Sequence, residues 1–131
     1  MNDKEREEEA LKWLDRARKD LRAAKMLFNN DEEPDFDLAC YLSQQCAEKS
    51  LKALLIYLGI RFAYKHDLEY LMGLLPANEQ GKFAEVELEW LSSWATEGRY
   101  PGDAAGATRE EAQKAIDIAE TVYNKVVIPL V

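Results

Sequence analysis

The segment from Leu38 to Leu58 constrains the fold more than any other part of the chain, because it is apolar on more than one face. At helical spacing its apolar residues form a broad band, whereas a surface helix carries a single narrow row. The band consists of Leu38, Ala39, Tyr41, Leu42, Cys46, Leu51, Ala53, Leu55, Tyr57 and Leu58. The sequence therefore predicts a central helix that packs among several neighbours. We expect it to end at Gly59, since glycine enters the left-handed conformation without a Cβ clash.

Helical periodicity also extends over most of the remaining chain. Long helices are predicted over Asp3–Asn29, over Phe83–Ala95, and from Thr108 onward, where Glu111 completes a capping box. A short helix is expected over Leu68–Leu75, with Asp67 as its N-cap. Residues 1–131 therefore predict one all-α domain, an antiparallel four-helix up-and-down bundle with a short extra helix.

Composition excludes several classes of protein. No apolar run approaches the roughly 18 residues of a membrane span, and the charged start MNDKEREEEA lacks the apolar core of a signal peptide, so we expect a cytoplasmic protein without a membrane partner. Cys40 and Cys46 fit buried small apolar residues better than a metal site. The acidic loop from Asp31 to Asp37 lacks calcium-ligand spacing and is expected to cap the next helix. No metal and no cofactor are predicted.

Charge is distributed unevenly along the chain. The net charge is −8, yet the segment from Lys49 to His66 contains four basic residues (Lys49, Lys52, Arg61, Lys65) and no acid. Such a basic segment in an acidic protein can bind a phosphate locally while the whole molecule repels bulk polyanions. Alternatively, Lys49 and Lys52 are solvated residues of the helix surface, with Lys52 paired to Glu48 four residues earlier.

Four segments together resemble the HEPN domains of bacteria and archaea. They are WLDRARKDLRAA at 13–24, YLSQQCAEKSLKALL at 41–55, KHDL at 65–68, and RYPG at 99–102 followed by TREEAQKAIDIAE at 108–120. The resemblance implies a helical bundle that is usually a homodimer. It also implies a possible minimal nucleotidyltransferase subunit as partner, either in a toxin–antitoxin pair or in a two-gene nucleotidyltransferase module.

The resemblance further implies a site in the loop after the central helix. Many HEPN proteins look like metal-independent ribonucleases with an Arg, four to six residues and a His, a spacing that Arg61 and His66 match. In such a site His66 would take the proton of a ribose 2′-hydroxyl, and Arg61 would hold the phosphate. The placement of the motif after the second helix, however, resembles the branch of small nucleotide-binding or accessory domains.

Three functions follow from this reading. The first is a nucleotide- or nucleic-acid-binding accessory domain that works with a nucleotidyltransferase partner. The phosphate- and nucleotide-binding candidates for it are Arg61, Tyr64, Lys65, His66, Arg99 and Tyr100. The second is a metal-independent ribonuclease toxin that uses Arg61 and His66 as catalytic residues. The third is a dimeric scaffold for protein interactions.

Overall fold

All regular structure in the computed structural model, which describes residues 1–95 and 106–130, is helical, and this confirms the predicted all-α class. Three helices are long: α1 (Asp3–Phe28), α2 (Phe36–Tyr57) and α6 (Arg109–Leu130). Between α2 and α6 lie four short elements: α3 (Leu68–Gly73), α4 (Ala77–Gln80), the 3₁₀ helix η1 (Gly81–Phe83) and α5 (Leu88–Ser92). None of the described helices is long and apolar enough to cross a membrane.

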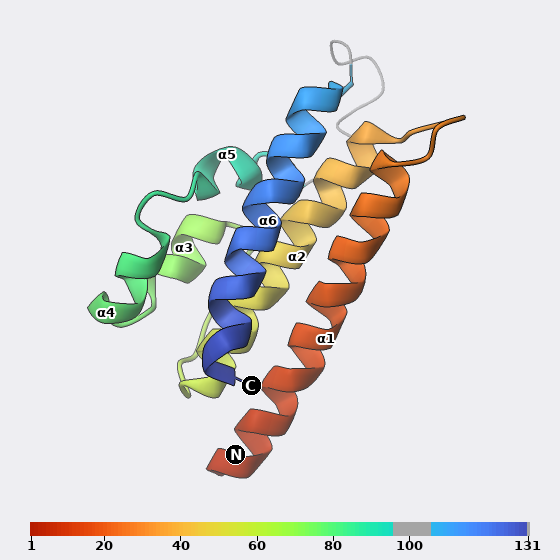
Figure 1. The fold of residues 1–131 in the computed structure, drawn as a ribbon. Helices are drawn as coiled ribbons and strands as arrows, with labels where there is room; N and C mark the ends of the chain where they lie inside the picture. Colours follow the sequence, from red (N-terminus) through yellow and green to blue (C-terminus); the bar gives the residue numbers. More distant parts are fainter. Residues whose placement is uncertain (96–105, 131) are drawn as a thin grey trace.

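The helices form an up-and-down bundle in which short helices make the third leg (Figure 1). Helix α1 runs antiparallel to α2, the chain then returns through α3, α4 and α5, and α6 runs in the same direction as α2. Helix α2 packs against both α1 and α6, and α3 and α5 cover a further side of it. The apolar band of α2 therefore meets neighbours on several sides, as its sequence predicts.

The core is built around the middle of α2. Leu51, Leu54 and Leu55 are almost completely buried. An apolar row of α1 is buried as well, and it consists of Ala10, Leu14, Ala17, Leu21 and Ala24. Both cysteines are buried thiols, as expected, and burial raises the pKa of the Cys46 thiol to about 12.

The helix ends follow the capping chemistry that the sequence predicts. The Asp35 carboxylate accepts the backbone N–H of Leu38 at 3.0 Å, so the acidic loop caps α2. Asp67 caps α3 in the same way. Thr108 and Glu111 form the reciprocal pair of hydrogen bonds expected of a capping box at the start of α6. Gly59 has φ of +74°, so the chain leaves α2 through the left-handed conformation.

The helix predicted over Phe83–Ala95 is wrong as one continuous element. Helix η1 ends at Phe83 and α5 begins at Leu88, with an irregular segment between them. Phe83 and Leu88 are both buried, although residues five apart lie about 140° apart around a helix. Breaking the helix lets both side chains reach the core, while Val86 and Trp90 remain partly exposed.

Candidate functional site

The predicted site lies in the loop from Gly59 to Asp67, called here the 59–67 loop, which joins α2 to α3. Its first turn is fixed by the N–H of Ile60, which donates to the carbonyl of Leu55 at 2.9 Å. Its middle is fixed by the N–H of Ala63, which donates to the hydroxyl of Tyr70 at 2.9 Å. Asp67 then caps α3. The loop is therefore attached at both ends and in the middle.

A row of polar side chains on α2 supports this loop from below. Gln44, Glu48 and Lys52 are spaced by four residues, so they share one face of the helix. All three are buried. The Nζ of Lys52 lies 2.9 Å from Oε2 of Glu48, and the two side chains are only 3% and 5% exposed. This is a buried ion pair within one helix. Further contacts to its two side chains come from the 59–67 loop.

His66 binds to this row through its ring and its backbone. Its Nδ1 lies 2.9 Å from Oε1 of Glu48, and its carbonyl accepts a hydrogen bond from Nε2 of Gln44 at 3.0 Å. Burial of the Glu48 carboxyl opposes its ionisation, but hydrogen bonds from Lys52, His66 and Gln44 outweigh that effect and lower its pKa. An ionised carboxylate only accepts hydrogen bonds, so Nδ1 of His66 carries a proton. In the neutral ring, Nε2 is then the basic nitrogen.

Aromatic rings enclose the other side of Lys52. Its Nζ lies 5.7 Å from the ring centroid of Trp13 on α1, 5.7 Å from that of Phe62 and 5.3 Å from that of Tyr64. These distances fall within the range of cation–π attraction. Lys52 therefore connects α1 and α2 to two residues of the 59–67 loop.

The outer surface of the loop is cationic and aromatic. Tyr64 is 87% exposed, and its ring meets the His66 ring edge-on at 5.6 Å. The Nζ of Lys65 lies 4.6 Å from the ring centroid of Tyr70. Arg61, Lys65 and His66 are all exposed, and within the described ranges neither Arg61 nor Lys65 makes an ion pair with an acid.

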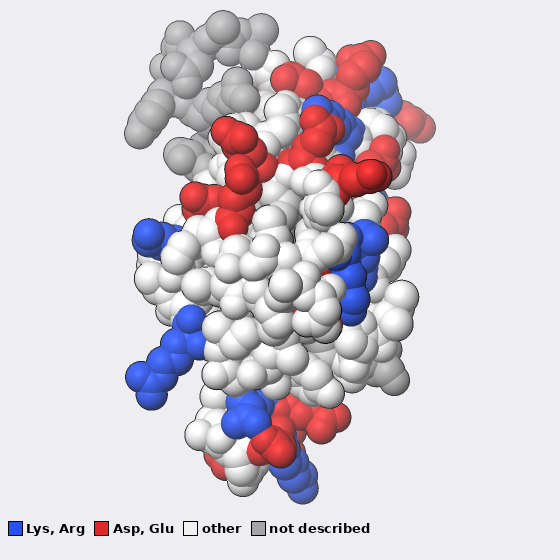
Figure 2. All heavy atoms as spheres, turned by 90° about the vertical axis from the view of Figure 1, so that its left-hand side faces the viewer, with Lys and Arg blue, Asp and Glu red and all other residues white. Residues whose placement is uncertain are grey.

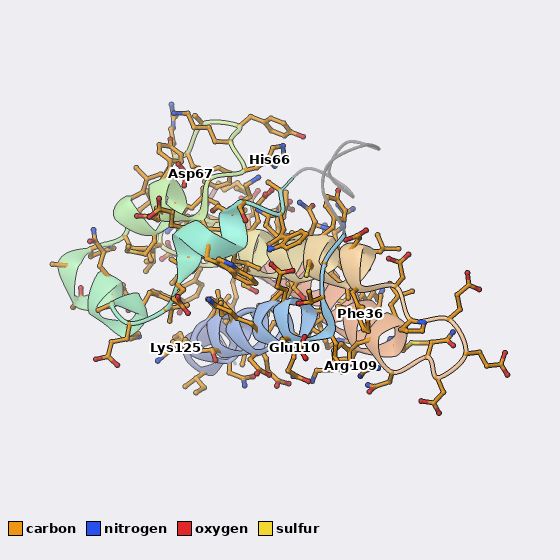
Figure 3. The ribbon with its side chains drawn as sticks, turned by 90° about the horizontal axis from the view of Figure 1, so that it is seen from above. Phe36, His66, Asp67, Arg109, Glu110 and Lys125 are labelled. Carbon is orange, nitrogen blue, oxygen red and sulfur yellow. The ribbon has the colours of Figure 1, made fainter. Side chains whose placement is uncertain are left out.

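The predicted site residues are brought together only in part. Tyr64 and His66 touch each other. Arg61 instead lines a hollow of about 390 Å³ together with Arg6, Ile56, Gly59 and Phe62 among others, and makes no hydrogen bond or ion pair with His66. Arg99 and Tyr100 lie outside the described residues. Figure 3 shows His66 and Asp67 on the side of the bundle opposite Arg109, Glu110 and Lys125 of α6.

The expectation that Lys49 and Lys52 are solvated is wrong, although the predicted pairing of Lys52 with Glu48 is confirmed. The Nζ of Lys49 lies 2.6 Å from Asp20 of α1, and both side chains are mostly buried. Two of the four positive charges of the basic segment are thus neutralised inside the bundle. Of the basic groups in this segment, only those of Arg61 and Lys65, and that of His66 when it is protonated, are exposed to solvent as positive charges.

The sequence interpretation missed Gln44 and the contacts of Glu48 with the loop. The signal was present, since polar residues at steps of four on a helix that is otherwise apolar all round must be buried or face another segment. No group of three or more His, Cys, Asp or Glu among the residues that the structure describes is placed to hold a metal ion. The chemistry available at the loop is anion binding by Arg61 and Lys65, stacking on Tyr64, and proton transfer at His66.

Comparison with known proteins identifies one family. The sequence model of the HEPN domain matches residues 10–128. A protein of Methanocaldococcus jannaschii named "Putative toxin MJ1304" is 30% identical, over 86% of this chain and 82% of the relative.

Two solved structures are similar over almost their whole length. One is ST0689, described as an archaeal HEPN homologue, with a TM-score of 0.69 and 28% identity over 93% of this chain and 98% of that one. The other is TT1696 from Thermus thermophilus, with a TM-score of 0.72 and 27% identity over 91% of this chain and 96% of that one. The helical bundle described above is therefore a fold found in solved structures of relatives.

Proposed function

This chain belongs to the HEPN domain family, and we propose that it binds the nucleotides of an RNA strand at the 59–67 loop. Family membership and the relative named as a toxin support a nucleic-acid-related or toxin function. The observation that carries the finer proposal is the outer surface of the loop. There an exposed tyrosine, Tyr64, lies in the sequence between two exposed cations, Arg61 and Lys65, that no acid neutralises within the described residues.

Each residue of the loop has a distinct part in this proposal. Arg61 offers two parallel N–H donors to a phosphate, and Lys65 offers a point charge. Tyr64 offers a ring for stacking on a base, and one side of that ring is already fixed by Lys52 and His66. The net charge of −8 makes the rest of the molecule repel a polyanion, so binding is confined to this loop.

Binding is tested by fluorescence anisotropy with a 5′-labelled single-stranded RNA of about ten nucleotides, within the usual range of site sizes for single-strand binding. Loss of one stacked base costs about 1–3 kcal/mol, so Tyr64→Ala is expected to weaken binding by roughly 5- to 150-fold. Arg61→Ala is expected to weaken it too and to reduce its salt dependence. Arg22→Ala, which removes an exposed arginine of α1, is the matched control. An equal loss in Arg22→Ala, or no binding by the wild type, contradicts the proposal.

A second candidate function, metal-independent RNA cleavage, is favoured by the contact between Glu48 and His66. A carboxylate that accepts the Nδ1 proton holds an imidazole in the tautomer whose Nε2 can act as a base. In the proposed step, Nε2 takes the proton of a ribose 2′-hydroxyl and the 2′-oxygen attacks the adjacent phosphorus. The bond to the 5′-oxygen breaks, that oxygen takes a proton from water, and His66 returns its own added proton to the solvent. The products are a 2′,3′-cyclic phosphate and a 5′-hydroxyl, and Arg61 stabilises the charge that develops on the phosphoryl oxygens.

Cleavage is tested by incubating the protein with the same RNA and identifying the new ends by mass spectrometry. His66→Ala is expected to abolish turnover and to leave RNA binding nearly intact, and Glu48→Gln is expected to lower turnover. EDTA is expected to have no effect, because the proposed step uses only side chains. Cyclic phosphate ends that persist in His66→Ala would assign the activity to a contaminant.

Two partners are part of the proposal. A homodimer is supported by apolar side chains left exposed where α2 and α6 end, among them Tyr57, Leu58 and Ile128. Near the end of α6, Val126 and Leu130 pack onto the bundle, while Ile128 is 75% exposed. A monomer in sedimentation at tens of micromolar contradicts the dimer. A minimal nucleotidyltransferase subunit is the second proposed partner, and co-purification from co-expressed chains tests it.

A further inference from the structure

We propose that the face formed by α3, α5 and the irregular segment between η1 and α5 binds an extended segment of a second protein in which basic and aliphatic side chains alternate. This inference is independent of the RNA proposal and concerns another surface. Figure 2 shows this face, whose middle is mostly uncharged and whose upper part gathers acidic side chains. The 59–67 loop takes no part in it.

The centre of this face is an apolar hollow with an acidic rim. Its volume is about 530 Å³. Its apolar lining includes Met72, Phe83, Val86, Leu88 and Trp90. The exposed Glu69, Glu87 and Glu89 also line it. A partner side chain that enters this hollow must therefore be apolar, and the residues next to it in the partner's chain must be positively charged.

Two other hollows share lining residues with the first, and we call the three together the acidic groove. A hollow of about 160 Å³ shares Val86 and Glu87 with the first and reaches Asp117 and Thr121 of α6. Another of about 480 Å³ shares Val86 with both and extends to Lys125. Three neighbouring hollows around Val86 suit an extended polypeptide better than a compact small molecule, since successive side chains of a strand can enter successive hollows.

The charge of the acidic groove favours a basic partner. Its lining has five acids, Glu69, Glu85, Glu87, Glu89 and Asp117, and two bases, Lys82 and Lys125. An RNA strand is repelled by such a surface, and an acidic peptide is repelled equally. Of the macromolecules that present regular positive charge, a basic polypeptide segment also supplies the aliphatic side chains that the hollow needs.

The chain itself already places one ammonium group here. The Nζ of Lys114 lies 4.3 Å from the ring centroid of Trp90 and 3.2 Å from the carboxylate of Glu87. The two ion-pair partners are 38% and 62% exposed, so the pair is weak and easily exchanged. A partner lysine or arginine can make the same two contacts, and Lys114 competes with it.

The test uses two fluorescein-labelled peptides of equal length, one alternating Lys with Leu and the other alternating Lys with Ser. The full chain is expected to bind the Lys–Leu peptide at least about 10-fold more tightly, because only leucine fills the hollow. The double variant Glu87→Gln/Glu89→Gln is expected to weaken binding of this peptide about 5-fold or more. The matched control Glu32→Gln/Glu33→Gln removes the same charge from the loop before α2 and should leave binding unchanged.

A charge-matched comparison separates this proposal from general attraction between charges. Lys114→Ala frees Trp90 and Glu87, so it is expected to tighten binding of the Lys–Leu peptide more than Lys12→Ala, which removes the same charge from an exposed ion pair of α1, whereas nonspecific attraction predicts equal tightening in both variants. Circular dichroism and the indole N–H signals in a two-dimensional NMR spectrum verify folding, and the Trp90 signal should shift on titration. Equal binding of both peptides, equal losses in both double variants, or full competition by spermine would overturn the proposal.

Discussion

The 59–67 loop and the acidic groove follow each other in the sequence, but they carry opposite charge and are supported differently. The loop is supported by the buried pair of Glu48 and Lys52, whose side chains are 5% and 3% exposed. The groove has its charges on the outside, where Glu69, Glu87 and Glu89 all face solvent. In the groove, the charged residues of the sequence therefore lie on the surface. Beneath the loop, by contrast, two charged residues are buried and form part of the internal structure.

The difference has a consequence for mutation. A buried ion pair contributes little net stability as a pair, but removing one partner leaves an uncompensated charge inside the protein. An exposed pair such as Lys114 and Glu87 loses little when either side chain is changed. The loop should therefore be sensitive to changes beneath it, and the groove should tolerate changes of its own charges.

The largest expected effect is that of Glu48→Ala. Lys52 loses its counter-ion while it remains buried, so the free energy of unfolding is expected to fall by about 3–5 kcal/mol. The control in the groove, Glu87→Ala, is expected to change it by no more than about 0.5 kcal/mol. Urea denaturation of the purified variants measures both. Similar losses in the two variants would remove the distinction between the regions.

A smaller loss is expected for Lys52→Met. Glu48 keeps its hydrogen bonds from His66 and Gln44, so we expect a loss of about 1–3 kcal/mol in unfolding free energy. RNA affinity is also expected to fall, because Lys52 contacts Tyr64 from within. Lys49→Met is the control, because Lys49 lies on the same helix but pairs with Asp20 and not with the loop. This variant should leave RNA affinity unchanged.

Most of the fold could be predicted from the sequence because it depends on local patterns. The row from Ala10 to Ala24, the stop at Gly59 and the caps at Asp67 and Thr108 are all read within one or two helical turns. The break after Phe83 could not be read this way. It follows from where the core lies relative to Phe83 and Leu88, and that is a property of the assembled bundle.

The candidate site was predictable in composition but not in arrangement. The motif identified Arg61 and His66, yet the structure places His66 against Glu48 and places Arg61 at a separate hollow beside Arg6. Glu48 and His66, 18 positions apart in the sequence, are brought together by the turn of the loop. No local spacing encodes that contact.

Acid pH provides a reversible form of the Glu48 experiment. Because the pKa of Glu48 is lower in the folded protein than its ordinary value of 4.5, the carboxylate stabilises the fold above about pH 4.5. That contribution is lost as pH falls through the lowered pKa. The difference in unfolding free energy between wild type and Glu48→Gln should therefore shrink below about pH 4.5. A Glu48 difference that persists undiminished at about pH 3 would contradict this.

The smallest expected effect connects the two regions through space. If the acids of the groove repel RNA from the neighbouring loop, the triple variant Glu85→Gln/Glu87→Gln/Glu89→Gln should bind the labelled RNA more tightly than wild type. The gain should be at most about 5-fold at about 0.01 M salt and nearly absent at about 0.15 M, because the screening length falls from about 30 Å to about 8 Å. The control triple variant Asp31→Asn/Glu32→Gln/Glu33→Gln makes the same change in net charge at the opposite end of α2 from the 59–67 loop (Figure 1). A larger gain in the groove variant than in the control would assign the repulsion to local charge. Equal gains would assign it to the net charge of the molecule, and the groove would then have no influence of its own on the loop.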